Sequence, residues 1–176
     1  ELIGYDYEDD KIIDPKLKKA SFNPIFIYGK SGSGKTHLLH ACANILKKQN
    51  LNVFFAKGQT FTNHFVKAIK NGNMHKFRST YRNIDALIVD DIDVFSNKNA
   101  TQEEFFHTFN TLHNASAQII LSAKTPPSQI SNIEPRLLSR FDWGISLSFT
   151  MPSNENLRKI ILSKTKIYNL IINNDA

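Results

Sequence analysis

The sequence contains only one cysteine among its 176 residues, so no disulfide bond can form within the chain. No apolar run approaches the roughly 20 residues that a membrane-spanning helix needs. Glycine is also sparse, at 7 residues, while 41% of the residues are hydrophobic, which excludes collagen-like and disordered chains. We therefore expect a soluble domain from a reducing cytoplasm, in which Cys42 is a small buried side chain of a helix.

Positive charge is in moderate excess, because 22 lysines and arginines outnumber 16 acids and give a net charge of +6. This excess suits a polyanionic partner such as nucleic acid, but a lysine-rich proteome produces the same balance. Charge alone therefore assigns no partner.

The chain changes character at residue 23. The residues before it open with a cluster of acids followed by lysines, and we interpret them as a weakly structured lead-in. Because the chain starts with Glu1 rather than methionine, we expect it to be a piece of a longer protein. From residue 23 onward, short apolar runs alternate with amphipathic segments of helical length, as in a parallel sheet with crossover helices. We expect an α/β fold with five strands, at residues 25–28, 53–55, 86–90, 118–122 and 145–149.

Apolar periodicity predicts the helices between these strands. Apolar residues recur at helical spacing over residues 36–49 and 60–69. Thr101 and Glu104 have the spacing of a capping box, which predicts a helix that begins there and runs to His113. A last helix is expected to begin near Ser153, after a proline. The buried face of the helix that ends at His113 is expected to carry Phe105, Phe106, Phe109 and Leu112.

A glycine-rich segment follows the first predicted strand and precedes the first predicted helix. Residues 29–36 match the phosphate-binding pattern G-x-x-x-x-G-K-[ST] at every fixed position. In this pattern, backbone N–H groups and a helix N-terminus surround a polyphosphate, the lysine reaches the β and γ phosphates, and the hydroxyl binds Mg²⁺. The same residues fail the dinucleotide pattern at His37 and the hydrolase pattern at Ser33. We therefore expect a nucleotide site formed by Gly29, Lys30, Ser31, Gly32, Ser33, Gly34, Lys35 and Thr36.

Two carboxylates follow one another at the end of the third predicted strand. Asp90 and Asp91 would lie at the carboxyl edge of a parallel sheet, which is where ligands bind in such folds. We predict that Asp90 binds the same Mg²⁺ as Thr36, and that Asp91 positions or deprotonates a water.

Hydrolysis of a triphosphate needs further positive charge around the γ phosphate. Arg136 and Arg140 are four residues apart between the fourth and fifth predicted strands, so both can face one side of a short helical turn. A surface ion pair is the alternative role for either arginine. The six histidines, including His37 and His40, lack the spacing of a metal site and are interpreted as structural.

Taken together, these segments resemble one family, the AAA+ ATPase core of the bacterial chromosomal replication initiator DnaA. The resemblance extends over residues 23–168, and its glutamine-glutamate-phenylalanine and arginine segments are far more specific than a phosphate loop alone. It implies a P-loop NTPase fold of AAA+ type, with helices on both faces of a five-stranded parallel sheet and the start of a helical lid. The resemblance rests on residues 23–29, 34–41, 77–83, 90–92, 101–110, 136–141 and 143–144.

The resemblance also implies an activity. Members bind ATP with Mg²⁺, hydrolyse it slowly as an off switch, and assemble head to tail in the ATP form on origin DNA, which they help to open. A replicative helicase or its loader is a further partner, and the bacterial cytoplasm is the expected location. On this basis the chain divides into a lead-in (1–22), a nucleotide-binding α/β core (23–152) and the start of a truncated lid (153–176).

Several residues match functional positions of the family. Asp90 and Asp91 match the metal and water-positioning pair, and Lys35 and Thr36 match the residues that hold nucleotide and metal. Arg140 matches the arginine that reaches the ATP of a neighbouring subunit, and Arg136 matches a second arginine of that segment. The positions that touch single-stranded DNA in a central channel are matched by Val66 and Lys98.

The sequence departs from the family at two of these places. Lys124 follows the fourth strand where the family commonly has an acid that senses the γ phosphate, which predicts altered sensing or hydrolysis. Ala100 stands where the family is often basic beside the DNA channel. Both departures favour an alternative, a regulatory paralogue or helicase loader that binds an initiator or helicase. A small-molecule kinase is a further alternative, although the sequence shows no arginine-rich lid for one.

Overall fold

The computed structural model describes residues 22–168, so residues 1–21 of the predicted lead-in and residues 169–176 of the predicted lid lie outside the described residues. At the centre is a parallel sheet of five strands in the order β2-β3-β4-β1-β5, which confirms the predicted sheet. The ends differ from the prediction by two residues at β2 and by one at β4 and β5. The strands are β1 (Ile25–Tyr28), β2 (Val53–Lys57), β3 (Ala86–Asp90), β4 (Gln118–Ala123) and β5 (Ile145–Ser148).

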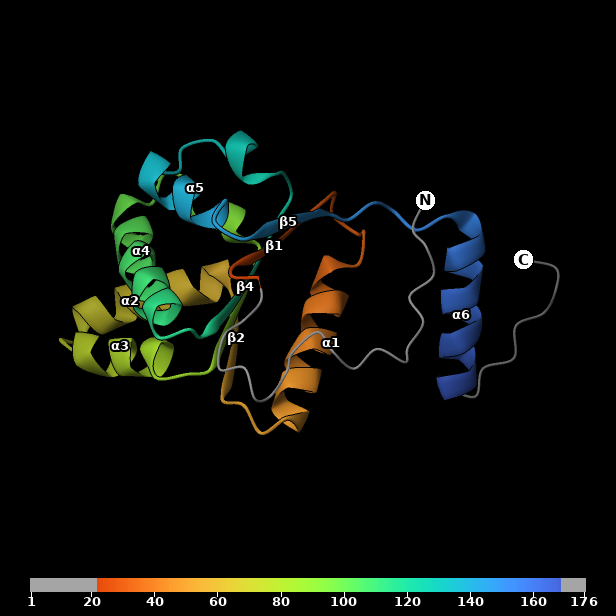
Figure 1. The fold of residues 1–176 in the computed structure, drawn as a ribbon, viewed down its shortest axis with the longest axis horizontal. Coiled ribbons are helices and arrows are strands. Elements are labelled where there is room, and N and C mark those ends of the chain that lie inside the picture. Colours follow the sequence, from red (N-terminus) through yellow and green to blue (C-terminus); the bar gives the residue numbers. More distant parts are fainter. Residues whose placement is uncertain (1–21, 169–176) are drawn as a thin grey trace.

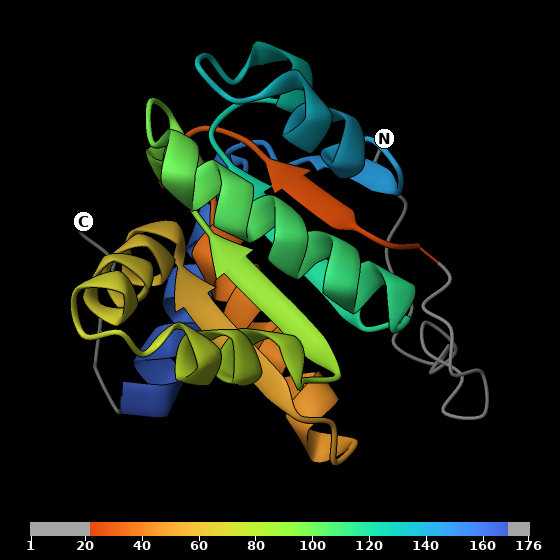
Figure 2. The same ribbon diagram turned by 90° about the vertical axis from the view of Figure 1, so that its left-hand side faces the viewer.

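Helices cover both faces of the sheet, as predicted. Figure 1 shows α1 on one side and α2 to α5 on the other, and Figure 2 shows α4 crossing in front of the sheet. Two short 3-10 helices, η1 (Ile92–Phe95) and η2 (Pro127–Gln129), follow β3 and β4. The helices are α1 (Lys35–Lys48), α2 (Gly58–Lys70), α3 (Met74–Arg82), α4 (Asn99–Asn114), α5 (Pro135–Phe141) and α6 (Asn154–Tyr168).

The two faces of the sheet carry different cores, and β3 contributes to both. Leu87 and Val89 point into an aromatic core beneath α2 to α5, whereas Ala86 and Ile88 point to the apolar face of α1. All five residues of β3 are buried, which confirms a central strand covered on both sides. Phe61 stands at the centre of the aromatic core, with its ring centroid 4.9–5.7 Å from those of Phe77, Tyr81, Phe95 and Phe105.

The predicted capping box at Thr101 is wrong. The helix begins two residues earlier, at Asn99, and its N-cap residue Lys98 makes no side-chain cap hydrogen bond. Glu104 instead lies buried and accepts hydrogen bonds from Arg82 at 2.7 Å and Arg78 at 2.9 and 3.1 Å. The sequence pattern assigns this carboxylate to a helix cap, but in the structure it binds two arginines that lie four residues apart on one face of α3.

Three further features differ from expectation. The helix α3 was not predicted, because only Phe77 and Tyr81 of its nine residues are buried and most of the others are polar or charged. Phe106 is partly rather than fully buried, while the other three expected core residues of α4 are buried. Cys42 is likewise partly buried, and burial raises the pKa of its thiol.

The last helix begins at Asn154, one residue after the predicted start. It stands beyond α1 in Figure 1, on the side of the molecule away from α2 to α5. Its apolar side chains at Leu157, Ile160, Ile161 and Leu162 are exposed. Across residues 22–168, no helix combines the length and the apolar character needed to cross a bilayer.

Candidate functional site

The phosphate loop connects the carboxyl end of β1 to the start of α1. Gly34 has a left-handed backbone with φ 101°, which a side chain would strain, and it is the N-cap residue of α1. Gly29 is constrained by space, because a Cβ there would overlap the carbonyl oxygen of Phe149. The loop residues Gly29 to Gly34 thus have the backbone and the helix N-terminus that a polyphosphate needs.

Lys35 lies inside this loop with only 6% of its surface exposed. Its Nζ donates hydrogen bonds to the carbonyl oxygens of Gly29 at 2.6 Å and Lys30 at 3.0 Å. The ammonium is therefore held at the base of the loop, where it can exchange these neutral carbonyls for charged phosphate oxygens. In the same loop, the hydroxyl of Ser33 is buried and has no hydrogen-bond partner, so it too is available to a ligand.

The predicted metal pair is brought together across the sheet. Thr36 Oγ1 donates a hydrogen bond to Asp90 Oδ2 at 2.7 Å, and Asp90 is fully buried. The other oxygen of Asp90 accepts a hydrogen bond from the hydroxyl of Ser122, the penultimate residue of β4. A hydroxyl and a carboxylate are oxygen ligands of the kind that Mg²⁺ takes, usually completed by water and phosphate oxygens. Within residues 22–168, no three His, Cys, Asp or Glu side chains form a metal site by themselves.

Asp91 adopts a left-handed backbone with φ 56° and ψ 60°, which is uncommon for a residue with a side chain. Its N–H donates to the hydroxyl of Ser122 at 3.0 Å, so one serine connects both acids. Burial raises the pKa of the Asp91 carboxyl, and the charge of Asp90 raises it further, while Lys35 acts in the opposite direction. A carboxyl with a raised pKa is a better proton acceptor once it is ionised.

Ser122 is the residue of this site whose role was not predicted from the sequence. Val89 of β3 is in register with Leu121 of β4, so the next residues, Asp90 and Ser122, lie side by side. A signal for it existed: Ser122 is a polar residue at the end of an apolar run, in the same position along its strand as Asp90. We call the loop residues 29–36 with Asp90, Asp91 and Ser122 the phosphate edge.

The two predicted arginines lie together on α5, as expected. Their guanidinium carbons lie 4.8 Å (Arg136) and 5.2 Å (Arg140) from the ring centroid of Phe106 on α4. Arg140 also lies 3.9 Å from the Trp143 ring, and its Nε donates to Asn110 Oδ1 at 2.8 Å. We call Arg136, Arg140, Phe106 and Trp143 the arginine surface.

The arginine surface and the phosphate edge lie at opposite ends of the strands. Trp143 precedes the amino end of β5, and the adjacent Gly144 packs against Pro24, immediately before β1. The phosphate loop, in contrast, begins where β1 ends. Because all five strands run parallel, Arg140 lies near their amino ends, whereas the phosphate loop of the same chain lies at their carboxyl ends. Arg136 additionally pairs with Glu134 at 2.6 Å, which is the surface ion pair considered as its alternative role.

Val66 and Lys98 lie on the outside of α2 and at the start of α4. The side chain of Val66 is exposed. Lys98 Nζ donates to Gln59 Oε1 at 3.1 Å, and Gln59 is two helical turns before Val66 on α2. The structure therefore brings the two residues to one flank of α2, separate from the phosphate loop.

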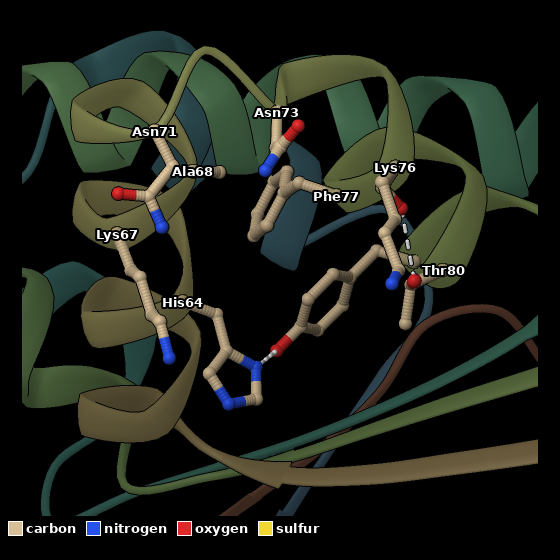
Figure 3. A pocket seen from close by; sticks show the side chains of 9 residues that line it. His64, Lys67, Ala68, Asn71, Asn73, Lys76, Phe77 and Thr80 are labelled. Carbon is tan, nitrogen blue, oxygen red and sulfur yellow. Dashed lines mark hydrogen bonds between the residues drawn. The ribbon is translucent and has the colours of Figure 1, made fainter.

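One concavity lies away from the phosphate edge. It has a volume of about 330 Å³ and lies between α2 and α3 (Figure 3), and its lining includes the buried side chains of Phe77 and Tyr81. The Tyr81 hydroxyl and His64 Nδ1 are 2.9 Å apart there, and burial raises the pKa of Tyr81. None of the predicted site residues lines it, and its rim consists of exposed side chains.

Comparisons with known proteins match this chain to bacterial DnaA proteins. The family model for the bacterial DnaA ATPase domain matches residues 11–148. The chromosomal replication initiator protein DnaA 2 of Protochlamydia amoebophila is 53% identical over 147 residues, which is 84% of this chain and 33% of that protein. The chain thus spans about a third of the length of this curated relative.

Two solved structures are similar to this chain. Domain III of the Thermotoga maritima replication initiation protein DnaA has a TM-score of 0.85 at 34% identity, covering 88% of this chain and 66% of that one. A replication initiator DnaA bound to AMPPCP and single-stranded DNA has a TM-score of 0.78 at 40% identity, covering 87% and 48%. These likenesses confirm the predicted fold of AAA+ type. On its sequence and its fold, the chain belongs to the bacterial DnaA ATPase-domain family.

Proposed function

We propose that this chain is the nucleotide-binding core of a replication initiator, which binds ATP with Mg²⁺, assembles head to tail in the ATP form and engages origin DNA. The observation that carries the proposal is the phosphate edge. Buried Lys35 sits inside the loop, and Thr36 contacts the fully buried Asp90 across the sheet at 2.7 Å. Burying the charges of Lys35 and Asp90 costs stability, and a bound polyphosphate with Mg²⁺ would offset that cost by giving both charges partners of opposite sign.

Each residue of the phosphate edge has a task in this function. The loop N–H groups and the start of α1 would hold the phosphates, and Lys35 would move its hydrogen bonds from two carbonyls to phosphate oxygens. Thr36 and Asp90 would hold Mg²⁺, which neutralises negative charge on the β and γ phosphates. Asp91 would orient the attacking water and accept its proton, since burial raises the pKa of its carboxyl and so makes the ionised form a better proton acceptor.

Slow hydrolysis would require an arginine that this phosphate edge does not contain. Arg140 lies at the opposite end of the strands, so it would serve the nucleotide of a neighbouring copy. Head-to-tail contact between copies would bring the two edges together, and repetition of that contact gives an open filament. The contacts from Asn110 and Trp143 hold the Arg140 guanidinium in place before a partner arrives.

DNA contact is the least direct part of the proposal. It is supported by the common flank of Val66 and Lys98 and by the relative whose structure includes single-stranded DNA. The basic residue and the exposed apolar one suit a backbone contact that does not depend on base sequence. A replicative helicase or its loader would be a further partner of the assembled form.

The experiment that tests self-assembly compares Arg140→Ala with the unaltered chain in sedimentation with AMPPCP or ADP. We expect AMPPCP, but not ADP, to promote assembly of the unaltered chain, and Arg140→Ala to abolish it. The affinity of Arg140→Ala for AMPPCP should stay within about twofold, because Arg140 is remote from its own loop. Lys48→Ala is the matched control, since it removes an exposed cation at the far end of α1. Equal assembly with AMPPCP and ADP would contradict the proposal.

A further inference from the structure

One face of α4 lies along the segment that carries the two arginines. The residues of this face recur every three or four positions, and their partners follow in the same order along α5 and the residues after it. The ring of Phe106 lies under both guanidinium groups, and Asn110 accepts a hydrogen bond from Arg140. Farther along α4, His113 contacts the ring of Trp143, with the two ring centroids 5.0 Å apart. The position of α5 along α4 therefore decides where both arginines are presented.

Gln102 is the first residue of this face, and it holds backbone atoms rather than side chains. Its side chain is buried, with only 1% of the residue exposed. Its Nε2 donates hydrogen bonds to the carbonyl oxygens of Phe95 and Asn132, each at 2.9 Å. Its Oε1 accepts a hydrogen bond from the N–H of Glu134 at 2.8 Å. Gln102 thus ties the end of η1 to the residues that immediately precede α5.

These hydrogen bonds restrict the position of α5 more than the ring contacts do. Apolar contact is not directional, whereas a buried amide needs partners at short distance and in good alignment. Glu134 is the N-cap residue of α5, and its carboxylate pairs with Arg136 at 2.6 Å. Contacts therefore connect Gln102 through Glu134 to Arg136. Because α5 has only seven residues, a shift of its start also moves Arg140.

We propose that Gln102 is a positioning residue, which sets where α5 lies along α4 and thereby presents Arg136 and Arg140 to the nucleotide of a neighbouring copy. The inference rests on the proposed self-assembly and adds to it a residue that contacts neither guanidinium group. All three hydrogen bonds of the Gln102 side chain go to backbone atoms, so it acts only through the backbone that it holds.

The first test is Gln102→Met, which keeps the length of the side chain and removes its amide. Trp143 is the only tryptophan of the chain, so its fluorescence reports on the arginine surface without any nucleotide. We expect stronger quenching of Trp143 by acrylamide, because the Arg140 guanidinium, 3.9 Å from the ring, moves away from it. We also expect assembly with AMPPCP to weaken about tenfold in sedimentation, while the affinity for AMPPCP stays within about twofold.

Glu104→Gln is the matched control for a general loss of stability. Glu104 is also a buried polar residue of α4, but its hydrogen bonds go to the arginines of α3 rather than to the start of α5. Glu104→Gln should therefore leave both the quenching of Trp143 and the assembly unchanged.

A second variant reaches the same hydrogen bond from α5, should Gln102→Met fail to fold. Glu134→Pro removes the N–H that Gln102 Oε1 accepts, and the φ of −60° at Glu134 already suits proline. Glu134→Ala removes the side chain and its pair with Arg136 but keeps that N–H. We expect Glu134→Pro to increase the quenching of Trp143 and to weaken assembly beyond any change in Glu134→Ala.

The outcomes separate this inference from the proposed function. Unchanged quenching in Gln102→Met, or equal quenching in Glu134→Pro and Glu134→Ala, would overturn the inference. An equal change of quenching in Glu104→Gln would also overturn it, because the effect would then be general loss of stability. If the unaltered chain does not assemble with AMPPCP while the quenching changes as expected, the proposed self-assembly fails and the placement of α5 by Gln102 stands.

Discussion

The phosphate edge and the arginine surface both depend on charged side chains, but these side chains are buried at the phosphate edge and exposed at the arginine surface. At the phosphate edge Lys35 is 6% exposed and Asp90 is fully buried. At the arginine surface the side chain of Arg136 is 46% exposed and Trp143 is 50% exposed. The charged side chains of the phosphate edge are therefore buried. Those of the arginine surface are at the protein surface, where they stack on aromatic rings.

This difference shows what each region can do alone. A buried charge requires partners, and the chain supplies them as loop carbonyls, Thr36 and Ser122, so the buried charges of the phosphate edge are hydrogen-bonded within one molecule. Arginines stacked on rings are held in place but keep donor groups free for another molecule. Under the proposed function, the arginine surface would act only on the nucleotide of a neighbouring copy.

Both regions are supported by the same hydrophobic core. The largest effect on stability is therefore expected from Phe141→Ala. Phe141 lies under the arginine surface, is fully buried and has its ring centroid 5.5 Å from that of Phe26 in β1. We expect its truncation to reduce the free energy of unfolding by about 3–5 kcal/mol, measured by denaturant titration. The exposed Trp143, truncated to alanine, should cost about 1 kcal/mol or less. Similar losses for both variants would mean that α5 is not part of the main cooperative unit.

Lys35→Ala tests whether the phosphate edge binds the nucleotide. Because Lys35 would contact phosphates common to both nucleotides, we expect the affinities for AMPPCP and for ADP to fall about 100-fold. Calorimetric titration measures both values. Lys48→Ala, at the exposed end of the same helix, should leave them unchanged. An unchanged affinity in Lys35→Ala would place the nucleotide elsewhere in the molecule.

Glu104→Gln tests the connection between α3 and α4 that replaces the expected cap. The glutamine keeps the shape but loses the charge that receives Arg78 and Arg82, so we expect the free energy of unfolding to fall by about 1–2 kcal/mol. Glu103→Gln is the control, because Glu103 is the preceding residue of α4 and is exposed. Equal effects of the two substitutions in thermal unfolding would show that the arginine contacts contribute nothing.

The smallest expected effect is that of Asp91→Asn on the nucleotide-free chain. Because burial and Asp90 raise the pKa of Asp91 in the folded state, its ionised form opposes folding. Removing the charge should therefore raise the Tm at pH 7. The gain should shrink as the pH falls through the raised pKa and vanish below the ordinary value of 3.8, where the carboxyl is protonated in both states. Asp142→Asn, at an exposed position, should show no such pH dependence, and a gain that is independent of pH would refute this account of Asp91.

The sheet and the phosphate loop were predictable because their signals are local. Four consecutive apolar residues mark β3, and the loop pattern requires particular residues at consecutive positions. The contact between Thr36 and Asp90 then follows from parallel strands that end at one edge. Neither step needs knowledge of how distant segments pack.

The features that were not predicted depend on contacts between residues that are far apart in the sequence. The spacing of Thr101 and Glu104 is that of a cap, but the acid is taken by arginines more than twenty residues earlier in the chain. Ser122 becomes part of the site only through the register of β3 and β4, which no short pattern encodes. The helix α3 exists because Phe77 and Tyr81 reach an aromatic core built by other elements.

The most direct test of the central claim is an amide NMR titration of the unaltered chain with AMPPCP and Mg²⁺. The account predicts that the largest shifts fall on the loop residues 29–36 and at the ends of β3 and β4, near Asp90 and Ser122. Shifts concentrated instead around the concavity between α2 and α3, at His64 and Tyr81, would contradict it.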